Sequence, residues 1–256
     1  MIKRLISSSI IPPILLTMVS TYALGAIDPD IVKDRRFFFV QYIRYLENVP
    51  VGGFGTLSFR TTDFDFRIQA NDGTITSGNE TYGVGADGTI GAASPSIYPT
   101  YVNKNRFAGI TNGLISSDGS LIAGGQDTGS SIDALNPKFL FAIRAPADSV
   151  RYTNADLKGT YSFIMSSTFI NGSSFGYTSG VGKIIFDGNG NFSLTETLNN
   201  MGNRQTVSGS ATYSLGAGGS GTFSDAATKF ALGVSEDRKA FVAVSISSSD
   251  GVTFLI

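Results

Sequence analysis

The residue types that are missing limit the chemistry of this sequence. Its 256 residues include no histidine and no cysteine. Histidine is the usual general base near neutral pH and the commonest metal ligand, and the cysteine thiolate is a frequent nucleophile. A Ser-His-Asp triad, a cysteine nucleophile and an ordinary zinc, haem or copper site are therefore excluded. Any reaction would depend on carboxylates, lysine or tyrosine alone.

Pairs of carboxylates are the remaining candidates for acid–base chemistry, such as glycoside hydrolysis. The pairs are Asp63 with Asp65, and Glu80 with Asp87. Asp63 and Asp65 alternate with aromatic residues, so they share one face of a strand, and we expect that face to lie in solvent. Glu196 lies in a similar run and is also expected to point outward. The sequence therefore predicts a protein that is not an enzyme, with no catalytic residues and no cofactor.

A calcium site is a weaker candidate. Asp187, Asn189 and Asn191 place oxygen ligands at alternate positions, as a calcium-binding loop does. A full loop has glycine at its sixth position and an acidic residue at its twelfth, where this chain has Phe192 and Leu198. A tight hairpin turn explains the same residues, so no metal is expected.

Three aromatic residues are candidates for lining a ligand cavity. Phe37, Phe39 and Tyr42 lie in a run dense in aromatic and β-branched residues, which is typical of a strand. Packing in the core of a barrel explains the same residues and is the favoured alternative.

The composition favours β structure throughout. The chain has 31 glycines, 19 phenylalanines and 10 tyrosines, and only 15% of its residues are charged, against about 25% in an average soluble domain. Strands favour aromatic and β-branched residues, and tight turns favour Gly, Asn and Asp. No segment has convincing helical periodicity. The predicted strands cover residues 37–43, 53–60, 64–70, 74–83, 113–116, 120–124, 139–144, 160–164, 181–186, 191–198, 206–215, 221–224, 230–235, 240–246 and 252–256.

Short segments of the first half match segments of the second half, in the same order. A repeat of this kind identifies the unit of folding. The pairs are 55–59 with 182–186, 77–82 with 208–213, and 113–118 with 233–237. The sequence therefore predicts an all-β fold of two tandem antiparallel up-and-down β-barrel or meander units; one composite barrel is the alternative.

The predicted boundaries follow from this repeat. We expect a first β-barrel repeat over residues 26–145, a linker over 146–156 and a second β-barrel repeat over 157–256. The first unit carries two extra irregular stretches, 92–106 and 127–137, which are the expected places for a function specific to this protein.

The first 25 residues have the pattern of a signal peptide. Lys3 and Arg4 precede a mostly apolar run, and small residues end the segment before Ala26. Its removal leaves 231 residues with 17 basic and 20 acidic side chains, a net charge of −3. We expect export to the periplasm, the cell surface or the medium, and no nucleic-acid partner, because no basic stripe is present.

Part of the second half resembles a known group of proteins. The segments concerned are 156–163, 186–192 and 208–213. The first two contain the patterns LxGxYxF and DGxGN, and the third runs from Ser208-Gly209 to Tyr213. They are similar to loosely defined secreted bacterial β-rich repeat proteins, which implies a lipocalin-like barrel. The resemblance covers residues 156–225 and implies no activity.

Two functions are consistent with these features. The favoured one is an exported binding module for a small apolar ligand, because barrels of this size hold such ligands. The alternative is a structural or interaction subunit of the cell surface or of an extracellular assembly, with a protein partner or self-association.

Overall fold

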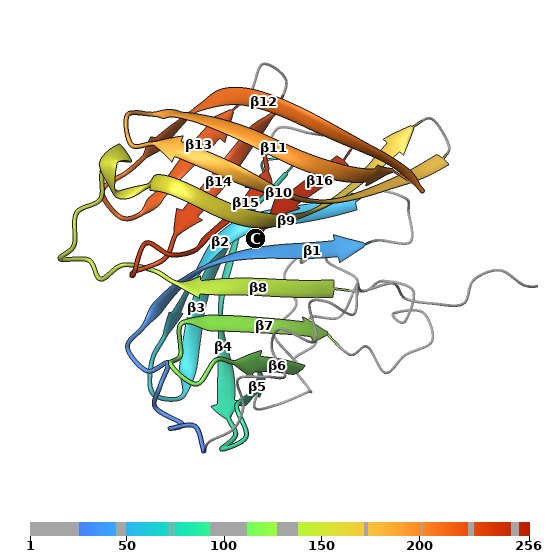
Figure 1. Ribbon diagram of the computed structural model, residues 1–256. Helices are drawn as coiled ribbons and strands as arrows, with labels where there is room; N and C mark the ends of the chain where they lie inside the picture. Colours follow the sequence, from blue (N-terminus) through green and yellow to red (C-terminus); the bar gives the residue numbers. More distant parts are fainter. Residues whose placement is uncertain are drawn as a thin grey trace, which may run out of the picture.

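A computed structural model shows an all-β protein (Figure 1). The predicted signal peptide and nearly all of the two irregular stretches lie outside the described residues. Apart from Asp72 and Thr74, the structure describes residues 26–44, 50–92, 112–126, 138–171, 174–200, 202–224, 228–246 and 251–256.

The first half of the chain forms a closed antiparallel barrel of eight strands. Each strand pairs with the next along the chain, and β8 pairs back with β1. The strands are β1 (Arg36–Arg44), β2 (Pro50–Phe59), β3 (Asp63–Ala70), β4 (Ile75–Val84), β5 (Thr89–Ala92), β6 (Asn112–Ile115), β7 (Leu121–Gln126) and β8 (Lys138–Arg144).

The second half forms another closed antiparallel barrel of eight strands, with β16 pairing back to β9. Its strands are β9 (Lys158–Asn171), β10 (Ser174–Asp187), β11 (Asn191–Asn200), β12 (Asn203–Leu215), β13 (Ser220–Ser224), β14 (Lys229–Val234), β15 (Phe241–Ser245) and β16 (Gly251–Leu255). Two barrels are thus confirmed, and the alternative of one composite barrel is wrong because each sheet closes on itself.

The three matched pairs of segments lie on strands of the same rank. They lie on the second, fourth and sixth strands of the two barrels and the turns that follow. In the turn after the sixth strand, the Ser116 hydroxyl donates to Asp118 and accepts from the Leu121 N–H. Ser235 makes the same two bonds with Asp237 and the N–H five residues on. The turns therefore share their hydrogen bonds as well as their rank.

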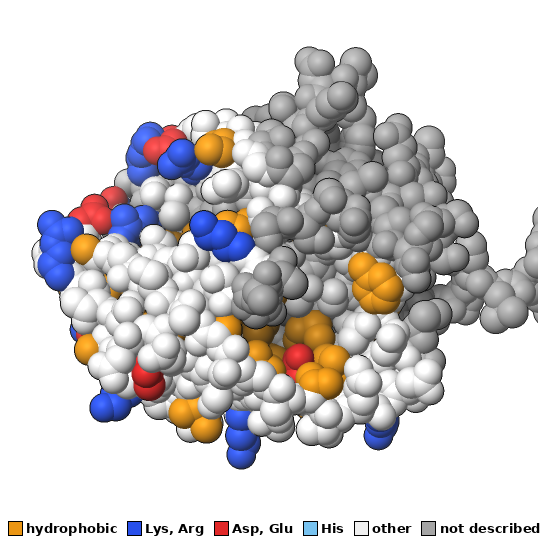
Figure 2. Space-filling view, turned by 90° about the horizontal axis from the view of Figure 1, so that it is seen from above, with side chains coloured by type: hydrophobic (Ala, Val, Ile, Leu, Met, Phe, Trp, Pro, Cys, Tyr) orange, Lys and Arg blue, Asp and Glu red, His pale blue; other side chains and the backbone are white. Residues whose placement is uncertain are grey.

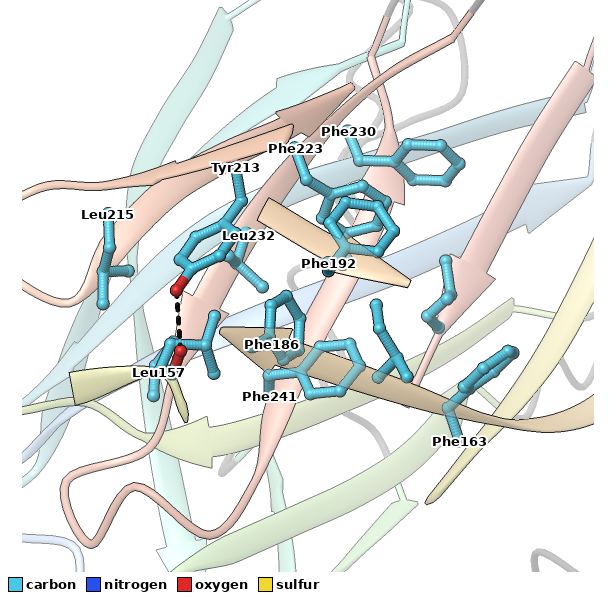
Figure 3. Close-up of a cluster of buried hydrophobic side chains, with 14 of the residues drawn as sticks. Leu157, Phe163, Phe186, Phe192, Tyr213, Leu215, Phe223, Phe230, Leu232 and Phe241 are labelled. Atoms are coloured by element: carbon cyan, nitrogen blue, oxygen red, sulfur yellow. Dashed lines mark hydrogen bonds between the residues drawn. The ribbon is translucent and has the colours of Figure 1, made fainter. Parts of the chain in front are cut away.

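The segment before each barrel closes one end of it. Ile27 and Val32 are buried against the turns of the first barrel, and Tyr152 and Leu157 are buried in the same way in the second. The Tyr213 hydroxyl donates to the Leu157 carbonyl at 2.8 Å, which ties the segment to the barrel (Figure 3). Aromatic side chains fill this closed half, and Phe186 lies in the middle of them with Phe192, Tyr213 and Phe241 in ring contact.

A third apolar cluster joins the two barrels. It lies between the outer faces of β1, β2 and β8 and those of β14, β15 and β16. Phe38 packs so closely on β14 that a Cβ on Gly233 would lie 2.7 Å from it. At the closed ends, the Glu236 N–H donates to the Arg144 carbonyl at 2.9 Å. Both barrels therefore present their closed ends on the same side of the molecule (Figure 1).

Candidate functional site

The second barrel has an opening in its wall. The strand β12 pairs with β11 along its whole length, but it pairs with β13 only over residues 212–215. Residues 203–211 of β12 therefore have no strand partner on the β13 side among the described residues. The inner side of this barrel is open between its fourth and fifth strands.

The side chains behind the opening are apolar and only half-buried. Leu194, Leu198 and Val207 alternate with exposed residues, so they point into the barrel. A Cβ placed on the inward-facing Gly209 would meet no atom within 4 Å. From above, the surface shows a hollow in which hydrophobic side chains surround an acidic group (Figure 2). We use the name hollow for the inner side of the second barrel at this opening, which is lined by Phe163, Met165, Leu194, Glu196, Leu198, Val207 and Gly209.

Glu196 lies inside the second barrel, so the expectation that it points outward is wrong. It shares the inner face of β11 with Phe192, Leu194 and Leu198, and the exposed threonines lie on the other face. A Cβ on Gly182 would lie 2.7 Å from the Phe163 ring and 2.8 Å from the Glu196 Cβ. Removal from water raises the pKa of the Glu196 carboxyl above its ordinary value. The inward orientation of Glu196 could have been predicted from the sequence, because Glu196 occupies an apolar position of a period-2 pattern.

In the first barrel, the corresponding pair of strands is β4 and β5. The strand β4 pairs with β5 only over residues 82–84, so the described part of β4 before Tyr82 lacks a partner on that side. Glu80 lies there, pairs with Phe64 and points inward with Tyr82. Desolvation raises the pKa of the Glu80 carboxyl from 4.5 to about 7.

The two glutamates do not occupy corresponding positions. In the matched segments on the fourth strands, Glu80 corresponds to Ala211. On the third strands, Glu196 pairs with Gly182, as Ile68 pairs with Gly55, so Glu196 corresponds to Ile68. At the position of each glutamate, the other barrel therefore has an apolar residue: Ala211 for Glu80, and Ile68 for Glu196.

The other candidate carboxylates have structural partners. Asp63 and Asp65 lie on the outer face of β3, as expected, and both form ion pairs with Arg60. Asp87 accepts hydrogen bonds from the N–H and the hydroxyl of Thr89 in the turn before β5. Glu80 is therefore separated from Asp87, because one lies in the barrel and the other in a turn at its closed end.

The weak calcium candidates form a hairpin turn between β10 and β11. The Asp187 carboxylate accepts hydrogen bonds from the N–H groups of Asn189 and Asn191 and from the side-chain amide of Asn191. These bonds lower the pKa of Asp187. Within the described residues, no group of three or more acidic side chains could hold a metal ion. The turn accounts for these residue types without a metal.

The predicted ligand-lining residues lie in two different clusters. Phe37 and Phe39 are fully buried in the core of the first barrel, and Tyr42 lies in the cluster between the barrels, stacked on Phe139 at 5.6 Å. Contact between these three residues and a ligand stays a prediction, and their packing with protein side chains accounts for their burial.

A separate crevice of about 220 Å³ lies where the two barrels meet. Phe38, Phe54 and Ile75 give it an apolar lining, and Arg67 is the cation on its rim. It is the second place where a small molecule would contact apolar side chains, and its charge is opposite to that of the hollow.

Comparisons with known proteins do not assign a family. No family model and no curated protein matches this sequence. Among solved structures, the chain is similar to a protein of unknown function from the DUF3598 family of Nostoc punctiforme, with 11% identity, 86% of this chain and 94% of that chain covered, and a TM-score of 0.26. It is also similar to intact Ap-TbpB with its N and C lobes, with 10% identity, 91% and 78% coverage and a TM-score of 0.27.

Kievitone hydratase from Nectria haematococca is a third such structure, with 8% identity, 92% coverage of both chains and a TM-score of 0.28. These TM-scores are too low for any of the three to support a functional assignment. The function must be argued from the geometry of this chain.

Proposed function

We propose that this protein is an exported, non-enzymatic binding protein whose second barrel takes up a small, mainly apolar molecule through its side opening. The observation that carries the proposal is the unfilled inner side at Gly209, next to the inward-facing Leu194 and Leu198, which are only partly buried. A ligand that covers Leu194 and Leu198 removes apolar surface from water, which favours binding.

The open half of the barrel is the part suited to this role. The closed half is filled by apolar side chains such as Phe186 and Leu232, which are almost completely buried. The interior of an eight-stranded barrel is either filled by side chains or holds one small ligand, so a partly filled barrel fits a small molecule better than a large one. The signal-like first 25 residues support export. None of the described residues belongs to a helix long and apolar enough to cross a membrane.

The proposal is tested by filling the hollow. The φ angle of Gly209 is not in the left-handed region, so a larger side chain fits its backbone. We expect the neutral apolar dye N-phenylnaphthylamine to bind the mature protein in a saturable way and with increased fluorescence. Gly209→Phe should weaken the binding about tenfold or more, because the ring takes the space of the ligand.

The matched control is Ser210→Phe, the next residue of β12, which faces outward and is exposed. It adds the same ring to the same strand, and we expect it to leave dye binding unchanged. Equal affinities of the wild type and Gly209→Phe, or no saturable binding by the wild type, would contradict the proposal.

One observation favours the alternative, an interaction subunit. Tyr177, Val181 and Ile185 are exposed on the outer face of β10, and the last two are more than half exposed. This stripe would suit contact with a protein or a second copy. Sedimentation of the mature protein tests it: a concentration-dependent dimer that Val181→Lys dissociates would support this alternative, and a monomer at all concentrations would count against self-association.

A further inference from the structure

The carboxylate in the hollow has no cation opposite it. Desolvation is the cause of the raised Glu196 pKa, and no basic side chain offsets it. On β10, β11 and β12, the neighbouring basic residues Lys183 and Arg204 are exposed and lie on the outer face. Neither of these two residues therefore supplies a positive charge to the inner side of the barrel at Glu196.

The connections at the end of this barrel opposite its closed end contain no cation either. The residues between β9 and β10, β11 and β12, β13 and β14, and β15 and β16 include no lysine and no arginine in the sequence. The inner faces of β10, β11 and β12 and these four connections thus offer no cationic partner for this carboxylate. Burying an unpaired ionised carboxylate under a purely apolar ligand would be costly, so an apolar ligand alone would be disfavoured.

A ligand with its own cation resolves this conflict. We propose that the hollow binds an amphipathic amine, whose ammonium group pairs with the Glu196 carboxylate while its apolar part contacts Phe163, Leu194 and Leu198. This inference rests on the proposed function and names the class of its ligand. The preference for an amine is expected only in the second barrel. The first barrel has Ile68 at the position of Glu196, and an isoleucine cannot pair with an ammonium group.

The electrostatics of the hollow favour this pairing. An ion pair gains strength when water is partly excluded, and a charge-assisted hydrogen bond is stronger than a neutral one. The aromatic ring of Phe163 lies beside the base of Glu196, and a ring face can add a cation–π contact with an ammonium group. A fatty acid would meet repulsion in the same place.

The test compares three probes with the same chain: decylamine, decanol and decanoate. Each is titrated at about pH 8 by displacement of N-phenylnaphthylamine, where an alkylamine carries its charge as lysine does. We expect the wild type to bind decylamine about tenfold or more tightly than decanol, and decanoate the most weakly. Glu196→Gln should remove the preference for the amine and leave decanol affinity within about threefold.

A second variant protects the test against a folding defect. Glu196→Ile introduces the residue of the first barrel, and we expect it to bind decanol at least as well as the wild type and to lose the amine preference. Circular dichroism confirms that both variants keep the fold. The outcomes then distinguish a failure of the amine preference from a failure of the proposed binding function.

Decanol binding that equals amine binding, or amine binding that survives Glu196→Gln, would overturn this inference and leave the proposed function standing. The proposed function itself would be overturned if none of the three probes displaces the dye and Gly209→Phe leaves the affinity for the dye unchanged. Preferential binding of decanoate that Arg67→Ala abolishes would place the ligand in the crevice between the barrels and also overturn the inference.

Discussion

Glu80 should make the first barrel less stable as pH rises. Its carboxyl lies inside the barrel beside Phe64, and desolvation raises its pKa from 4.5 to about 7. Between these two values the folded state binds more protons than the unfolded state, so the free energy of unfolding falls with increasing pH. The loss begins near the unfolded pKa and is complete above the folded pKa.

The size of the effect follows from the shift. A rise from 4.5 to about 7 corresponds to an upper bound of about 3 kcal/mol. The side chain keeps some contact with water, which screens its charge, so we expect about 1–2 kcal/mol. Glu80→Gln removes the titration and retains the shape of the side chain. The variant should therefore gain about 1–2 kcal/mol relative to the wild type as pH increases through this range.

Urea unfolding of the mature protein, followed by circular dichroism at several pH values, measures this difference. The difference between variant and wild type isolates Glu80, because all other titrating groups are shared. Glu80→Ala, which introduces the residue that the second barrel has at this position, should show the same slope with a constant offset from lost packing. A difference that stays constant across the range, or that grows toward acid, would refute the reasoning.

Three further results are expected. Val242→Ala, in the fully buried cluster between the barrels, should cost about 1–3 kcal/mol in urea unfolding; an unchanged midpoint would mean that this strand does not hold the barrels together. Ser235→Ala removes the hydroxyl bonds to Asp237 and to the Ala240 N–H and should cost about 1–2 kcal/mol, visible as a lower melting temperature, while no change would show that the turn does not depend on them. Millimolar calcium should leave the melting temperature unchanged, because the Asp187 oxygens already accept three hydrogen bonds; a calcium-dependent rise that Asp187→Ala removes would contradict this.

Local patterns in the sequence located most strands, because turns depend on nearby residues. Asp87-Gly88 and Asp118-Gly119 supply the side-chain acceptor and the positive φ that tight turns need. The strand β5, Thr89–Ala92, was not predicted. The strands β9 and β10 are each 14 residues long, well beyond the predicted 160–164 and 181–186. The prediction was too short because the additional residues include many Ser and Gly, which do not favour strands by themselves.

The candidate site was not predicted. The run Phe37 to Val40 is apolar on both faces of β1, which indicates burial on both sides, yet only contact with β14 and β15 shows that the outer face meets another barrel. Glu196 was assigned to solvent because its nearest neighbours are threonines. The alternation Phe192, Leu194, Glu196 and Leu198 places it on the apolar face of β11.

The sequence by itself determined the β class, the turns, the two units and the absence of histidine and cysteine chemistry, because these depend on residue types and local spacing. Only the tertiary structure decided where the wall of the second barrel stays open. That opening arises because β12 is longer than β13, so their pairing stops early. Pairing between whole strands is a long-range property, and it converts a glutamate in a polar-looking run into a carboxylate that faces an apolar hollow.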